Sequence, residues 1–176
     1  LMFTGSTATG RTLAEQCARR LIGISAELGG KNPMIVTRNA DLATAARAAM
    51  RACFGNAGQL CLSIERIYVE RPAYPRFVDE LASRSRALRL GVNYDFTHDM
   101  GSLISAEHLS TVEGHVADAR AKGATVVAGG RARPDIGPFF FEPTVLTGVT
   151  DRPTIENRRQ AAVRWARVDD YQALLD

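Results

Sequence analysis

Apolar residues recur at helical spacing in four stretches of the chain. The clearest is residues 41–54, where the apolar side chains form one stripe opposite Arg47 and Arg51. Asn39 or Asp41 can cap this helix at its N-terminus, and a glycine follows its last turn at position 55. The same spacing predicts helices over residues 9–20, 74–88 and 106–122.

Short apolar runs between these helices predict strands. They cover residues 21–26, 34–36, 64–69, 125–127 and 139–146. The first run is expected to be a buried strand that stops at Glu27, where two glycines follow and allow a sharp change of direction. Helices that alternate with strands indicate an α/β fold with a largely parallel sheet.

Composition narrows the class of protein. The chain has 176 residues, 45% of them hydrophobic, and a net charge of +3, which is typical of a globular domain with its own core. No apolar run approaches the roughly 20 residues of a membrane helix. The first residues lack the basic and apolar regions of a signal peptide, so a cytoplasmic protein without membrane contact is expected. The basic residues are scattered and do not alternate with aromatic ones, which argues against a nucleic-acid partner.

The three cysteines are Cys17, Cys53 and Cys61. An odd number without a secretory signal favours reduced thiols, and no pair has the spacing of zinc ligands, so no metal site is expected. Cys61 ends a short Gly-Gln-Leu loop between a predicted helix and a predicted strand, a place where a thiol can reach a cleft and attack a carbonyl. The alternative is a buried, inert cysteine, which suits Cys17 and Cys53 better.

Two other features can carry chemistry. Glu27 ends an apolar run at a position where active-site groups often lie in α/β sheets; alternatively it turns into solvent and pairs with Lys31. The turn at residues 5–10 opens a helix whose free N–H groups can bind phosphate oxygens, although it has neither P-loop nor Rossmann glycine spacing. Its alternative interpretation is a plain N-cap.

Taken together, these segments resemble the aldehyde dehydrogenase superfamily. The matching segments are Phe-Thr-Gly-Ser-Thr at 3–7, Glu-Leu-Gly-Gly-Lys-Asn-Pro at 27–33, Phe-Gly-Asn-Ala-Gly-Gln-Leu-Cys at 54–61 and Phe-Phe-Glu-Pro-Thr-Val-Leu at 140–146. The resemblance covers about residues 1–152. Residues 61–70 are most similar to succinate-semialdehyde dehydrogenases of actinobacteria.

The resemblance implies a mechanism and a cofactor. Cys61 would attack a small aldehyde to give a thiohemiacetal, hydride would pass to NAD or NADP, and Glu27 would activate the water that hydrolyses the thioester. Succinate semialdehyde is the expected substrate. Gly5, Ser6 and Gly10 match the cofactor-contacting turn of the family, and Leu28 matches its nicotinamide-side contact. Family members form homo-oligomers.

The resemblance also implies that the chain divides into three regions. Residues 1–26 match the last part of a dinucleotide-binding domain, residues 27–152 match a three-layer catalytic domain, and residues 153–176 form a divergent tail. Family members are more than twice this length, and the Glu-x-Phe-Gly-Pro segment expected after Arg152 does not occur. A local frame disturbance between about residues 154 and 166 would explain this, because residues 168–175 again resemble the family.

Two alternatives to a dehydrogenase remain open at this point. One is a truncated, non-catalytic remnant that folds or oligomerises with a partner subunit, since a sheet without its neighbours exposes strand edges and apolar faces. The other keeps only Cys61 and Glu27 and predicts a cofactor-independent esterase or thioesterase.

Overall fold

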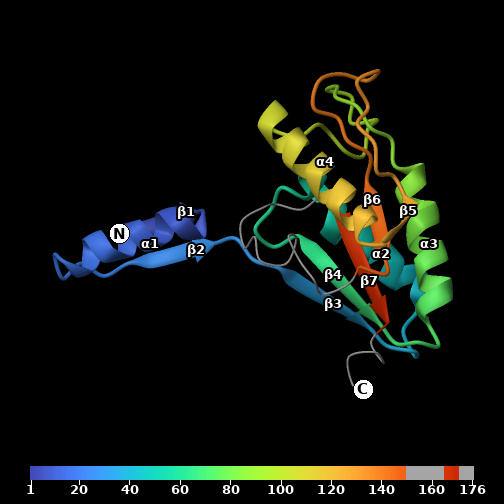
Figure 1. Cartoon of the computed structure of the whole chain (residues 1–176), viewed down its shortest axis with the longest axis horizontal. Coiled ribbons are helices and arrows are strands. Elements are labelled where there is room, and N and C mark those ends of the chain that lie inside the picture. The colour runs from blue at the N-terminus through green and yellow to red at the C-terminus, as the bar shows by residue number, and fades with distance from the viewer. Residues whose placement is uncertain (150–164, 171–176) are drawn as a thin grey trace.

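The chain has two parts that follow each other in sequence. The computed structural model describes residues 1–149 and the strand at 165–170. A small β–α–β unit comes first, and a five-stranded sheet with helices on both faces follows it. In Figure 1 the small unit extends to one side of the sheet. Helices and strands alternate, so the predicted α/β class is confirmed.

The N-terminal unit consists of β1 (Met2–Gly5), α1 (Thr7–Ala18) and β2 (Ser25–Leu28). The two strands are parallel, and their register places Gly5 beside Leu28 at the carboxyl ends of both strands. The turn from β1 into α1 therefore lies next to the chain segment that leaves β2. In the described part of the chain, this two-stranded sheet has no further strand.

The larger sheet has the strand order β3-β4-β7-β6-β5. All neighbouring strands are parallel except β5 and β6, which are antiparallel, so the predicted largely parallel sheet is confirmed. The strands are β3 (Asn32–Val36), β4 (Ile64–Val69), β5 (Thr125–Ala128), β6 (Thr144–Thr147) and β7 (Trp165–Asp170).

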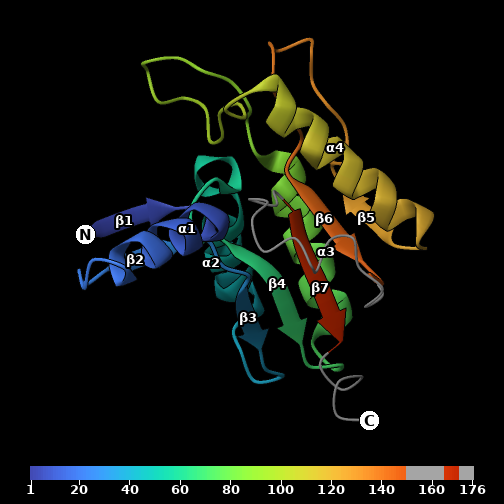
Figure 2. The same cartoon turned by 60° about the vertical axis from the view of Figure 1, so that its left-hand side comes forward.

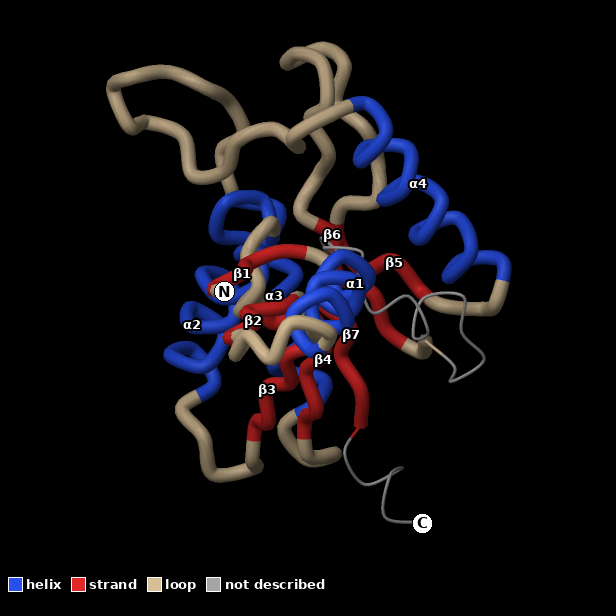
Figure 3. Tube along the Cα trace, turned by 90° about the vertical axis from the view of Figure 1, so that its left-hand side faces the viewer, coloured by secondary structure: helices blue, strands red, loops and turns tan. Residues whose placement is uncertain are grey.

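Helices cover both faces of this sheet. They are α2 (Leu42–Phe54), α3 (Tyr74–Ala87) and α4 (Ala106–Ala121). Helices α2 and α3 pack against each other on one face, and α4 crosses the opposite face near β5 and β6 (Figures 2 and 3). The arrangement is a three-layer sandwich of helix, sheet and helix.

Burial along β6 shows why both faces must be covered. Val145 and Leu146 are consecutive and both fully buried, although consecutive strand residues point to opposite faces. Leu146 packs with Ala119 of α4, whereas Val145 belongs to the main core, which also contains Phe77 and Leu81 of α3. Along β6, therefore, helical side chains cover both faces of the sheet.

The helix boundaries match the sequence pattern closely. Asp41 caps α2, as one of the two expected caps, because its carboxylate accepts hydrogen bonds from the N–H groups of Ala43 and Thr44 at 3.1 and 3.3 Å. Ser105 caps α4 in the same manner through the N–H of His108. The predicted strand at 64–69 coincides with β4.

Two predicted strands are partly wrong. The run at 21–26 is not a buried strand: Leu21 is 97% exposed in a left-handed turn (φ 53°), and β2 begins only at Ser25. Apolar character alone suggested burial, but the short unit offers this run no packing surface. The run at 139–146 forms a strand only over Thr144–Thr147, because Phe139 has a φ of 68° and breaks the extended conformation.

Strand β7 was not predicted. It lies in the expected divergent tail, where it begins at the end of the segment that departs from the family pattern, and it pairs in parallel between β4 and β6 in the middle of the sheet. The rest of the expected divergent tail, residues 153–164 and 171–176, lies outside the described residues. Most of the proposed frame disturbance, residues 154–164, lies outside them as well. None of the helices in the described part of the chain has the length and apolar character needed to span a bilayer.

Replacing a buried or an exposed phenylalanine by alanine should change the free energy of unfolding by different amounts. Phe77 is fully buried in α3, so Phe77→Ala should lower the free energy of unfolding by about 3–5 kcal/mol through lost contacts and a new cavity. Phe96 is 89% exposed, and Phe96→Ala should change it by less than about 0.5 kcal/mol. Urea unfolding followed by circular dichroism would measure both. Equal losses would contradict the assigned core.

Candidate active site

The loop that carries Cys61 begins with a tight left-handed turn. After α2, a short 3-10 turn covers Gly55–Gly58, in which Asn56 and Ala57 have φ values of 50° and 54°. Ala57 is buried, and its left-handed conformation costs about 1–2 kcal/mol relative to right-handed helical geometry. Such strain persists only where the surroundings enforce it, and it is concentrated at functional sites.

Side-chain hydrogen bonds hold this loop in place. The Gln59 amide donates to the carbonyl of Asn56 at 3.0 Å and to the carbonyl of Ser102 at 3.2 Å, which links the loop to a distant segment. A second turn follows, closed by a hydrogen bond from the N–H of Ser63 to the carbonyl of Leu60 at 3.1 Å. Cys61 lies in this second turn, which we call the nucleophile turn (residues 60–63) after the predicted role of Cys61.

Cys61 differs from the other two cysteines in exposure. All three are free thiols, but Cys17 and Cys53 are buried and Cys61 is exposed. Burial, together with the negative charge of Glu65, raises the pKa of Cys53 to about 12. Cys53 is therefore a protonated core residue, as expected. The buried alternative for Cys61 is wrong.

The nucleophile turn is joined to the segment that follows Glu27. The side-chain amide of Asn32 donates to the carbonyl of Cys61 at 2.8 Å and to the carbonyl of Ser63 at 3.0 Å. Next to it, the ammonium group of Lys31 lies 2.8 Å from the carboxylate of Glu65, whose side chain is only 5% exposed. The suggested pairing of Lys31 with Glu27 is wrong, because Lys31 pairs with Glu65.

Glu27 lies within β2, not after a buried strand, and its side chain is exposed. Three residues separate the carboxyl end of β2 from the amino end of β3, so Glu27 lies on one side of a short linker and Asn32 on the other. Because Asn32 binds the nucleophile turn, this linker joins the two candidate catalytic segments (Figure 1). Among the described residues, no hydrogen bond joins Glu27 to Cys61 directly.

The three residues of the expected cofactor turn and the expected nicotinamide contact Leu28 lie together in the N-terminal unit. Ser6 caps α1 by accepting a hydrogen bond from the N–H of Thr9 at 3.1 Å, and the first turn of α1 contains no acidic residue that would repel a phosphate. Gly5 and Leu28 are register partners. A Cβ atom at Gly10 would lie 2.7 Å from Leu28 Cδ2, so the absence of a side chain there allows α1 to approach β2. This turn fits a phosphate group, and the cofactor roles of its residues remain predictions.

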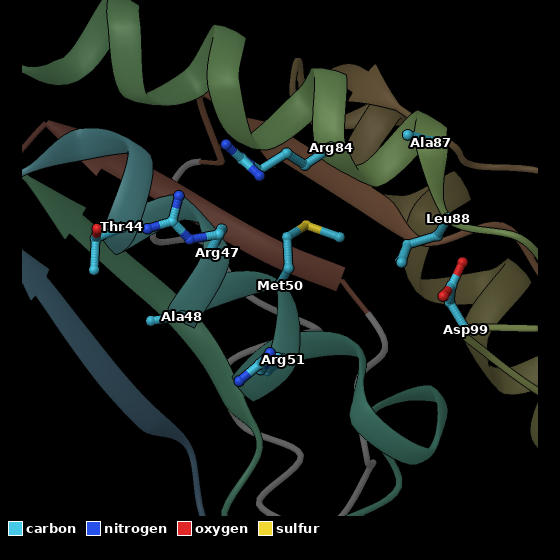
Figure 4. A pocket seen from close by; sticks show the side chains of 9 residues that line it. All are labelled: Thr44, Arg47, Ala48, Met50, Arg51, Arg84, Ala87, Leu88 and Asp99. Carbon is cyan, nitrogen blue, oxygen red and sulfur yellow. Dashed lines mark hydrogen bonds between the residues drawn. The ribbon is translucent and has the colours of Figure 1, made fainter.

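A separate pocket lies between α2 and α3. It has a volume of about 510 Å³ and includes neither Cys61 nor Glu27. Figure 4 shows Arg47 and Arg51 of α2 and Arg84 of α3 around the side chain of Met50. Arg84 forms an ion pair with Glu80. No group of three or more potential metal ligands occurs among the described residues.

Comparison with known proteins decides the family. The model of the aldehyde dehydrogenase family matches residues 1–158. The chain belongs to the aldehyde dehydrogenase family. Its resemblance to this family, inferred from four segments, is thereby confirmed.

Relatives within the aldehyde dehydrogenase family are close in sequence. The chain is 72% identical over 151 residues to a Mycolicibacterium smegmatis protein named "Putative succinate-semialdehyde dehydrogenase [NADP(+)]", covering 86% of this chain and 29% of that protein. It is 46% identical over 148 residues to the 3-sulfolactaldehyde dehydrogenase of Pseudomonas putida, covering 84% of this chain and 30% of that protein. The chain thus spans less than a third of the length of these relatives.

Solved structures of other proteins share its fold. An NADP-dependent enzyme of Escherichia coli superposes with a TM-score of 0.90 at 38% identity, covering 99% of this chain and 37% of that one. Betaine aldehyde dehydrogenase of Staphylococcus aureus, in complex with NAD+, gives a TM-score of 0.87 at 32% identity, with 96% and 34% covered. The predicted aldehyde-dehydrogenase-like three-layer fold is confirmed.

Sequence inspection missed the role of Asn32 and the Lys31–Glu65 pair. Both residues of the Lys-Asn dipeptide were visible in the segment that carries the resemblance. Only the three-dimensional pairing of β3 with β4 brings them to the nucleophile turn. A polar dipeptide directly before a proline, at the start of a strand, was the available signal.

The different exposure of the three cysteines predicts that an alkylating reagent modifies only one of them in the folded chain. At pH 7–9 iodoacetamide should modify Cys61 in the folded chain and leave Cys17 and Cys53 unmodified. The pKa of Cys53 is raised, so its thiol stays protonated until the pH approaches about 12. In urea all three should react. Peptide mapping by mass spectrometry reads the result, Cys61→Ser is the control, and rapid native labelling of Cys53 would contradict its burial.

Alanine substitution should affect the two glycines of the described α-helices differently. Gly114 in α4 has no atom within 4 Å of an added Cβ, so Gly114→Ala should stabilise its helix by about 0.5–1 kcal/mol. In α1, Gly10→Ala should lose this gain because Leu28 must move. Native-state hydrogen exchange of the two helices would measure both effects. Equal slowing of exchange would show that α1 is not closely packed on β2.

Proposed function

We propose that this chain carries the thiol and the base of an NAD(P)+-dependent aldehyde dehydrogenase that oxidises succinate semialdehyde to succinate. The observation that supports this most strongly is the position of Cys61. Its thiol is exposed in a turn that is hydrogen-bonded to the segment directly after Glu27. The Mycolicibacterium relative supports the choice of substrate and cofactor through its name.

Cys61 performs the first step. Its thiolate attacks the aldehyde carbon, a C–S bond forms, and the carbonyl oxygen becomes the oxyanion of a thiohemiacetal. Backbone N–H groups of a tight turn can stabilise such an oxyanion. When bound, the nicotinamide supplies the two-electron acceptor that receives hydride from this carbon, which leaves a thioester on Cys61.

Glu27 performs the second step. Its carboxylate takes a proton from water while the water oxygen attacks the thioester carbon. The C–S bond breaks, the electron pair returns to the Cys61 sulfur, and the carboxylic acid leaves. An exposed carboxylate on β2 has access to solvent, which this role requires.

The residues for the cofactor come from the N-terminal unit. The Gly5–Ser6 turn and Gly10 would hold a phosphate at the start of α1, and Leu28 would contact the nicotinamide side. Gly5 and Leu28 lie at the carboxyl ends of β1 and β2, next to Glu27, and Gly10 lies in the first turns of α1. The base and the cofactor-binding residues would thus belong to the N-terminal unit, and the nucleophile would belong to the part with the five-stranded sheet.

A second function is favoured by one observation. Large apolar side chains of the N-terminal unit are exposed: Met2 by 86% and Leu21 by 97%. Such surface is usual for a face that a partner covers. The second candidate is therefore a non-catalytic chain that associates with another subunit, with a further copy or a longer family member as the partner.

Activity measurements distinguish the two candidates. The purified chain is given succinate semialdehyde or another aldehyde, with NAD or NADP supplied separately, and reduced cofactor is measured. The proposal expects turnover that Cys61→Ala abolishes. Glu27→Gln should retain a burst of about one reduced cofactor per chain and lose at least about 100-fold in steady-state rate, because the thioester is no longer hydrolysed.

Sedimentation velocity on the same samples completes the test. No turnover from a folded chain, together with association that Leu21→Ser weakens, would support the non-catalytic candidate. Turnover that survives Cys61→Ala would contradict the proposed nucleophile.

A further inference from the structure

The amino end of β3 contains a hydrogen-bond donor aimed at the nucleophile turn. Both carbonyl groups that Asn32 binds, those of Cys61 and Ser63, belong to residues 60–63. An amide NH2 group has two hydrogens, and these two bonds, at 2.8 and 3.0 Å, use both of them. We propose that Asn32 is the positioning residue for Cys61, and this inference rests on the proposed role of Cys61 as nucleophile.

The backbone explains why this donor is held firmly. Pro33 follows Asn32 and restricts its backbone to extended geometry. The pairing of β3 with β4 changes register between Asn32 and Pro33, so Asn32 lies at an irregularity beside Ile64. The side chain therefore starts from a defined point next to the turn, one residue away from the regular ladder.

The orientation of the amide is also fixed. A Cβ atom at Gly30 would lie 3.2 Å from Asn32 Oδ1 and 3.8 Å from Nδ2, so the bare backbone of Gly30 leaves room for the amide oxygen. The oxygen faces the linker and the nitrogen faces the two carbonyls. A flipped amide would place an acceptor against two acceptors, which is unfavourable.

The neighbouring residue strengthens the attachment. Lys31 and the buried Glu65 form an ion pair at 2.8 Å, and Glu65 follows the nucleophile turn by two residues. Consecutive residues of one strand end thus hold both the turn and the start of β4. Removing one partner of such a pair leaves a buried charge, so the pair resists displacement.

Fixing these carbonyls has a chemical consequence. The carbonyl of Cys61 and the N–H of Leu62 belong to one planar peptide group, so a hydrogen bond to the first also sets the direction of the second. The turn then presents its N–H groups and the Cys61 thiol in one arrangement. Carbonyl addition needs such an arrangement because an oxyanion develops, whereas simple alkylation of a thiol does not.

Two reactions of Cys61 test this role separately. With p-nitrophenyl acetate, the thiolate attacks the acetyl carbon, a C–S bond forms, and p-nitrophenolate leaves with the electron pair of the broken C–O bond. With iodoacetamide, a C–S bond forms and iodide leaves. Both rates are measured on the full chain across pH 6–9, with Cys17 and Cys53 as internal reporters of folding.

The decisive variant is Asn32→Asp, which has nearly the same shape and presents an oxygen to both carbonyls. It should slow acylation by about tenfold or more and change alkylation by less than about twofold, with Cys17 and Cys53 still unreactive. Asn32→Ala should act in the same direction, and Gly30→Ala should give a smaller loss because it pushes on the amide. Asn39→Asp, at an exposed turn, is the matched control for the added charge.

Each outcome has a separate meaning. If the unmodified chain is acylated faster than free cysteine and Asn32→Asp leaves that rate unchanged, the positioning role is wrong and the proposed function stands. The positioning role is also wrong if Asn32→Asp slows both reactions equally or exposes Cys17 and Cys53, since Asn32 is then only structural. If the unmodified chain is acylated no faster than free cysteine, the proposed nucleophile fails, and the positioning role fails with it.

Discussion

Burial of β3 and β4 against the helical layer of α2 and α3 is the constraint on which the other features depend. Val36 of β3 and its register partner Val69 of β4 are fully buried in the core that α2 and α3 close, so a shift of β3 against β4 would move apolar side chains out of this core. The register of these two strands is therefore fixed. Their amino ends meet at Asn32 and Ile64, and the nucleophile turn directly precedes Ile64. The packing of the core thus determines which residue lies beside Cys61.

Electrostatics then separates two thiols that are close in sequence. Cys53 lies in the core near Glu65, and both its burial and that charge keep its proton bound. Cys61, beyond the left-handed turn, is exposed. Glu65 has two effects: it disfavours the thiolate of Cys53 and attracts Lys31 toward the start of β4. One buried carboxylate therefore helps to keep the inner thiol inert and the loop of the outer thiol in place.

Much of the fold followed from the sequence because its signals are local. Helical stripes, the Asp41 cap and the alternation of elements placed the helices and β4 within about two residues. Leu21 is apolar but exposed, since burial depends on what packs against a segment and not on its composition alone. Strand β7 became a central strand through its partners β4 and β6, which no local pattern indicates. The site was partly predictable for the same reason: the exposure of Cys61 agrees with its place in a loop, whereas the partners of Lys31 and Asn32 required the fold.

The short linker between β2 and β3 has a consequence for how this chemistry can be inherited. The proposed base Glu27, the turn-binding Asn32 and the proposed nucleophile Cys61 all fall within residues 27–61. A genetic exchange outside this interval replaces the cofactor-side helix or the outer helices without separating the three. Recombination can therefore change the ligands that the surrounding surfaces bind, while residues 27–61 are inherited together.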